Sequence, residues 1–80
     1  MTRDHIEDRV HEVLALVLKR PATRGQPVVR AEVQEWDSLS HIEIIYAVEE
    51  SLGVTFSEEE MAGLDGSAAI VAAAERHLAA

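Results

Sequence analysis

"WDSLSHIEIIYAVEE", residues 36–50, carries two stripes of apolar residues at helical spacing, and the pattern continues to Leu52 before Gly53 stops it. It predicts a helix over residues 38–52. One stripe suffices for a core face, and it comprises His41, Ile44, Ile45, Val48 and Leu52. The other comprises Leu39, Ile42 and Tyr46. A helix that is apolar on two sides is either deeply buried or offers one side to a partner, and here we favour the partner.

The start of this helix has more capping residues than it needs. Asp37, Ser38 and Ser40 are all strong N-cap types, and Ser40 with Glu43 has capping-box spacing. Because one cap is enough, a hydroxyl is left over. An exposed hydroxyl at a helix N-terminus is also a place where a phosphate is well tolerated, since free N–H groups and the helix dipole favour an anion. Ser38 is therefore either a helix cap or a site prepared for a phosphodiester.

The remaining helices follow from the same periodicity. The first is expected over about residues 3–19, with Thr2 as its cap and Pro21 closing it. A short third helix should follow the cap Ser57, and an alanine-rich fourth helix should follow the cap Ser67.

Residues 21–36 contain two prolines, one glycine and no helical stripe, which predicts a long loop. Val28, Val29 and Val33 are expected to anchor this loop to the core, and a strand is possible there, although nothing else in the chain offers it a partner. The expected fold is all-α: a four-helix bundle with three longer helices, one short third helix and a long loop after the first helix.

Composition limits the function. Eighty residues allow one small domain, 1–80, with an aliphatic core, because only 4% are aromatic. The absence of cysteine excludes disulfides and Cys-ligated zinc. No apolar run approaches a membrane span, and the first ten residues carry charges, unlike a signal peptide, so a cytoplasmic protein without a membrane partner is expected. We also expect a monomer.

Charge is distributed unevenly. Residues 31–75 contain 11 of the 15 acidic residues and none of the seven Lys and Arg residues. The negative potential that results repels nucleic acid and attracts basic partners.

Catalytic chemistry is poorly supported. The chain lacks a G-x-S-x-G elbow, no two histidines stand four residues apart, and the acids at 58–60 lack the EF-hand pattern. We therefore expect neither a catalytic residue nor a metal site, and we interpret His41 as a polar neighbour of the core rather than a base.

The segment from Trp36 to Glu60 resembles the acyl carrier proteins. The family motif D-S-L, followed by an apolar and acidic helix ending in E-E-x-[LF]-G-[IV], is matched by Asp37-Ser38-Leu39 and by residues 49–54, EESLGV. The helix order, loop and length fit the same plan, so the resemblance spans essentially the whole chain.

This resemblance implies that Ser38 carries 4′-phosphopantetheine, which a separate phosphopantetheinyl transferase transfers from coenzyme A. The arm would hold an acyl thioester and present it to partner enzymes such as ligases, acyltransferases or ketosynthases, as in fatty acid or polyketide biosynthesis. Asp37 would help to dock the transferase and its magnesium. Partner enzymes would recognise the face formed by Leu39, Ile42, Glu43, Tyr46, Glu49 and Glu50.

Two departures from fatty-acid carriers favour a dedicated partner set in a polyketide or other specialised pathway. Ser40 stands where many of those carriers have an acid, and Tyr46 stands where they have a smaller or more flexible residue. Glu35-Trp36 also replaces the L-G-G that precedes the serine in peptidyl carriers. Two alternatives stay open: a peptidyl or aminoacyl carrier, and a cofactor-free acidic helical module that docks a partner.

Overall fold

A computed structural model describes residues 2–22 and 25–79 of the chain, and all of its regular elements are helical. In chain order they are α1 (Arg3–Leu18), the 3-10 helix η1 (Arg30–Glu32), α2 (Ser38–Leu52), α3 (Glu58–Gly63) and α4 (Ser67–Ala79). The predicted all-α class with three longer helices and a short third one is confirmed, and α2 has the predicted bounds. The Cα radius of gyration is 11.3 Å, close to the roughly 12 Å of one compact domain of this length.

Local residues set most helix ends. Thr2 caps α1 by accepting a hydrogen bond from the His5 N–H (3.2 Å). Ser57 and Glu60 form a complete capping box at the start of α3. Gly53 ends α2 in the left-handed conformation with φ 68°, which glycine adopts without steric cost. These three ends agree with the sequence.

Two helix ends differ from the prediction. The first helix stops at Leu18 because Lys19 already has a left-handed φ of 55° and donates its N–H to the Ala15 carbonyl. Ser67 does not cap α4; it is the first helical residue, and its Oγ accepts the Val28 N–H (2.9 Å) while its own N–H donates to the Val28 carbonyl (2.8 Å). Ser67 therefore joins α4 to the long loop.

The loop between α1 and α2 is held by backbone contacts more than by valine side chains. Val33 is buried and Val28 packs against the core, but Val29 is 39% exposed and is not an anchor. Its backbone instead pairs with Gly66 in an isolated antiparallel bridge, the only trace of a strand in residues 25–79. A Cβ on Gly66 would meet the Val28 carbonyl oxygen at 3.0 Å, so glycine permits this close approach.

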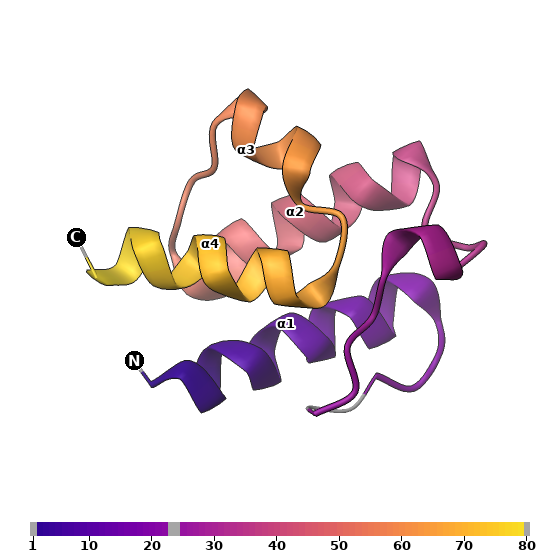
Figure 1. Cartoon of the computed structure of the whole chain (residues 1–80), viewed down its shortest axis with the longest axis horizontal. Coiled ribbons are helices and arrows are strands. Elements are labelled where there is room, and N and C mark those ends of the chain that lie inside the picture. The colour runs from indigo at the N-terminus through magenta and orange to yellow at the C-terminus, as the bar shows by residue number, and fades with distance from the viewer. Residues whose placement is uncertain (1, 23–24, 80) are drawn as a thin grey trace.

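The core lies where α1 packs against α2 and α4. The short helix α3 lies on the opposite side of α2 and α4 from α1 (Figure 1). Every residue of the predicted core stripe of α2 is buried. The apolar residues of α1 that recur at helical spacing face the same core: Ile6, Val10, Val13 and Leu14 are buried and Val17 is half-buried. The loop with η1 lies beside the first turn of α2, so it supports the segment that contains Ser38.

Candidate functional site

Asp37, not a serine, caps α2. Its Oδ1 accepts the Ser40 N–H (2.8 Å), so the proposed capping box of Ser40 with Glu43 is wrong. Ser38 occupies the first helical position, is exposed, and its hydroxyl forms no hydrogen bond with any residue in 2–22 or 25–79. The Ser38 hydroxyl is thus free at a helix N-terminus, the position that best accommodates a phosphate.

The Asp37 carboxylate adds a negative charge beside this hydroxyl. The Ser40 N–H and, to a smaller extent, the Ser40 hydroxyl hold the pKa of Asp37 below its usual range, because both donate to the ionised form. Asp37 is consequently ionised at neutral pH. A divalent cation or a basic side chain from another protein is attracted to such a charge.

A buried pair of aromatic rings, Trp36 and His41, fixes the residues that precede Ser38 in the sequence. The Trp36 Nε1–H donates to His41 Nδ1 (3.0 Å), and His41 Nε2 lies 2.8 Å from the Met61 carbonyl oxygen. Because the indole can only donate and the carbonyl can only accept, His41 here is the neutral tautomer with its proton on Nε2. His41 is 8% exposed, in agreement with its predicted place beside the core.

The second stripe of α2 is exposed, as predicted. Leu39, Ile42 and Tyr46 are 67%, 58% and 63% exposed, whereas Ile44 and Ile45 on the core face are fully buried. A shallow depression continues the stripe beyond Tyr46; Glu49, Glu50, Gly53, Val54 and Thr55 complete its lining. Together, these residues form an apolar surface with acidic edges that runs away from Ser38.

The three glutamates assigned to this face are not equivalent. Glu43 and Glu50 are exposed. Glu49 is half-buried, and its Oε2 accepts the Phe56 N–H (2.8 Å), which ties the end of α2 to the turn before α3. The sequence did not predict this bond, since its partner lies seven residues away in a loop.

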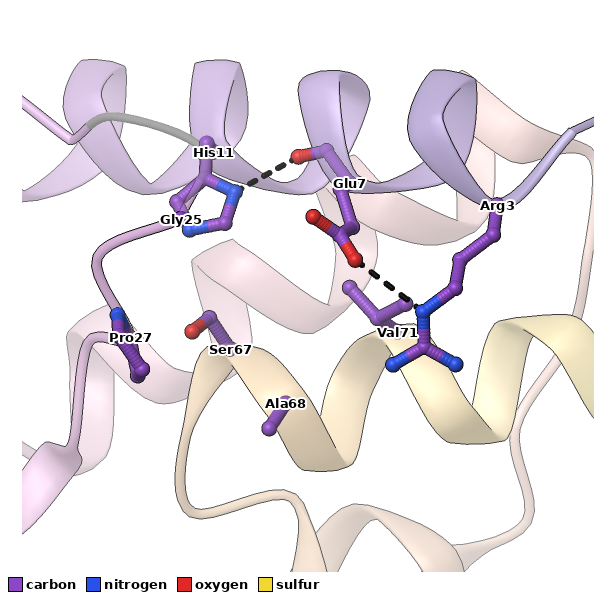
Figure 2. A pocket seen from close by; sticks show the side chains of 8 residues that line it. All are labelled: Arg3, Glu7, His11, Gly25, Pro27, Ser67, Ala68 and Val71. Carbon is purple, nitrogen blue, oxygen red and sulfur yellow. Dashed lines mark hydrogen bonds and ion pairs between the residues drawn. The ribbon is translucent and has the colours of Figure 1, made fainter.

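A separate cavity of about 200 Å³ lies between the first half of α1, the loop at residues 25–27 and the start of α4 (Figure 2). None of its lining residues comes from the segment 36–46. His11 on its wall is 6% exposed and donates from Nδ1 to the Glu7 carbonyl (2.8 Å). The other ring nitrogen, Nε2, is buried and meets no hydrogen-bond partner among the described residues.

No group of three or more potential metal ligands was found among residues 2–22 and 25–79. The helices that these residues form are also too short or too polar to cross a membrane.

Comparison of the chain with protein-family models, with curated proteins and with solved structures found no significant match. The resemblance to acyl carrier proteins therefore depends on the residues between Trp36 and Glu60 and on the geometry around Ser38.

Proposed function

We propose that this chain is an acyl carrier protein whose Ser38 carries 4′-phosphopantetheine. The observation that supports this most is the free hydroxyl of Ser38 in the first turn of α2, with Asp37 performing the capping role that Ser38 would otherwise fill. The proposal includes the bundle arrangement of the family and a role in a polyketide or other specialised pathway.

The modification is a phosphoryl transfer with simple stoichiometry. The Ser38 oxygen forms a bond to the phosphorus next to the pantetheine of coenzyme A, and the bond from that phosphorus to the nucleotide half breaks. The serine proton passes to a base of the transferase, and adenosine 3′,5′-bisphosphate leaves. This chain contributes an accessible hydroxyl, a helix N-terminus and the Asp37 carboxylate, which can bind magnesium together with the diphosphate.

The exposed stripe fits the recognition role in this proposal. Leu39, Ile42 and Tyr46 offer apolar anchors next to the arm, while Glu43 and Glu50 offer charge to a basic partner. Glu49 contributes mainly by holding the α2–α3 connection, since its carboxylate already accepts the Phe56 N–H.

The test is intact mass spectrometry after incubation with coenzyme A, magnesium and a promiscuous phosphopantetheinyl transferase. Wild type should gain one phosphopantetheine, and Ser38→Ala should gain none. Ser40→Ala is the matched control, because it keeps Ser38 and should be modified. A wild type without an adduct, or an equal adduct on Ser38→Ala, would contradict the carrier proposal.

The same experiment addresses the two alternatives. A cofactor-free interaction module, which the exposed stripe also suits, gains no mass yet still binds a partner through Leu39, Ile42 and Tyr46. A peptidyl or aminoacyl carrier gains the arm, so it is distinguished by loading the modified protein with acyl or aminoacyl groups.

A further inference from the structure

Arg30 bonds the segment that leads into the proposed attachment site. Its Nε donates to the Trp36 carbonyl (3.3 Å), which belongs to the residue two positions before Ser38. The backbone of Arg30 is held separately, because its N–H donates to the Asp65 carbonyl (2.9 Å). The half-buried Arg30 side chain therefore reaches from η1 to the residue that precedes the Asp37 cap of α2.

The Arg30 charge is unpaired. No carboxylate in residues 2–22 or 25–79 forms an ion pair with it, although the chain has 15 acidic residues. Arg3, by contrast, pairs with both Glu7 and Glu75, and Arg20 pairs with Glu35 at 3.8 Å. A guanidinium has five N–H donors, and only the Nε donor of Arg30 bonds a described residue. Its terminal amino groups remain for a ligand.

The region around Ser38 is acidic. Residues 31–75 contain no Lys or Arg, and Asp37 stands next to Ser38. A phosphodiester on Ser38 adds another negative charge to this acidic region. Two residues span at most about 7 Å of extended chain, so the Cα atoms of Trp36 and Ser38 lie within that distance, and Arg30 bonds the carbonyl at the near end of this short segment.

We propose that Arg30 is a positioning residue that binds the phosphate transferred to Ser38, first in coenzyme A and then as the phosphodiester. This inference depends on the carrier function proposed above. In the transfer, the bond from the Ser38 oxygen to phosphorus replaces the bond to the nucleotide half, and the serine proton goes to the transferase. Arg30 exchanges no proton. It donates hydrogen bonds to the phosphate oxygens, a geometry that guanidinium suits.

Arg30→Gln tests this, with Arg20→Gln as the matched control. Both substitutions remove one arginine from the loop between α1 and α2, but the Arg20 charge is already paired with Glu35. We expect Arg30→Gln to lower the transferase kcat/KM by about tenfold, the effect of losing one charge-assisted hydrogen bond. Arg20→Gln should stay within about twofold, and Arg30→Lys should recover part of the loss.

A second measurement uses NMR spectroscopy. In the wild-type protein, the NMR resonances of the Arg30 guanidinium should shift when phosphopantetheine is attached, and those of Arg20 should not. The phosphorus resonance of the diester should also differ between wild type and Arg30→Gln. A purely structural role in holding Trp36 would not move these signals, and circular dichroism melts identify any variant that fails to fold.

The two proposals fail separately. If wild type and both variants are modified at equal rates and the Arg30 resonances stay unchanged on modification, the role of Arg30 is wrong and the carrier function stands. If wild type gains no arm at all, the carrier function fails and the role of Arg30 fails with it.

Discussion

Neighbouring residues on α2 face opposite environments, and this predicts opposite effects of substitution. Ile45 is fully buried in the core, whereas Tyr46 is 63% exposed. Ile45→Ala should lower the free energy of unfolding by about 2–5 kcal/mol, through lost burial and the cavity left behind. Tyr46→Ala should change it by less than about 1 kcal/mol. Urea denaturation of the two variants checks this; an unfolded Tyr46→Ala beside an intact Ile45→Ala would reverse the assignment of the two faces.

The buried Nε2 of His11 predicts a stabilising substitution. A buried polar atom without a described partner costs free energy, and leucine removes this atom while also favouring a helix. Leucine also loses the Nδ1 hydrogen bond to the Glu7 carbonyl, but that carbonyl lies within α1 and keeps a helical N–H donor. His11→Leu should therefore raise the free energy of unfolding by about 1 kcal/mol. His5→Leu, at an exposed position of the same helix, is the control, because it makes the same change of residue and removes only an exposed hydrogen bond from the Arg9 Nε (3.4 Å). The prediction fails if thermal melts show His11→Leu less stable than His5→Leu.

At the scale of elements, the features that the sequence predicted are those set by residues close together in the chain. The start and end of α2, the capping box of α3 and the division of α2 into buried and exposed stripes are all local. Contacts over longer separations were missed. Ser67 was expected to cap α4, yet it bonds Val28, 39 positions away, and periodicity contains no information about such a partner.

The candidate site divides in the same way. The exposed hydroxyl and apolar stripe could be predicted, because they lie on one helix. The hydrogen bonds that hold the two ends of this helix in place could not be predicted. Trp36 bonds His41, and His41 bonds the Met61 carbonyl of α3. At the other end, Glu49 accepts the Phe56 N–H. These bonds depend on how separate elements pack.

The N-terminal cap of α2 predicts a pH dependence of stability. Hydrogen bonds from Ser40 lower the pKa of Asp37 in the folded state, so its contribution is complete above the pKa of the unfolded chain, about 4. It is lost as the pH falls through the lowered value. Glu60 behaves likewise, because the Ser57 N–H and then His77 lower its pKa.

The matched substitution is Asp37→Asn, since asparagine also caps helices but does not ionise. Below about pH 4 the free energy of unfolding of Asp37→Asn should fall less steeply than that of wild type. Glu58→Gln removes an exposed carboxylate that bonds no described residue, so the free energy of unfolding of this variant should fall with pH as steeply as that of wild type. The measurement is the urea midpoint of each protein from about pH 6 to about pH 2. If the midpoint of Asp37→Asn falls with pH as steeply as that of wild type, the stabilising role of the Asp37 charge is contradicted.

At the scale of the whole molecule, net charge opposes folding. The chain carries −8, and its smallest dimension is 18 Å. The Debye length is about 30 Å at 0.01 M salt and about 10 Å at 0.1 M. The other two dimensions are 34 and 26 Å, so at the lower salt concentration an acidic group repels acids over most of the molecule, and at the higher one it repels near neighbours only. The ion pairs of Arg3 and Arg20 are largely exposed and offset little of this repulsion.

We therefore expect the melting temperature to rise as sodium chloride increases from about 0.01 M to about 0.1 M. Sodium chloride is preferred to sulfate, which strengthens burial by a different mechanism. Glu43→Lys with Glu50→Lys changes the net charge from −8 to −4, because each substitution adds two positive charges. Both sites are exposed, so this variant should melt higher than wild type at low salt and respond less to added salt. If its salt response equals that of wild type, repulsion among the acids of residues 31–75 does not limit stability.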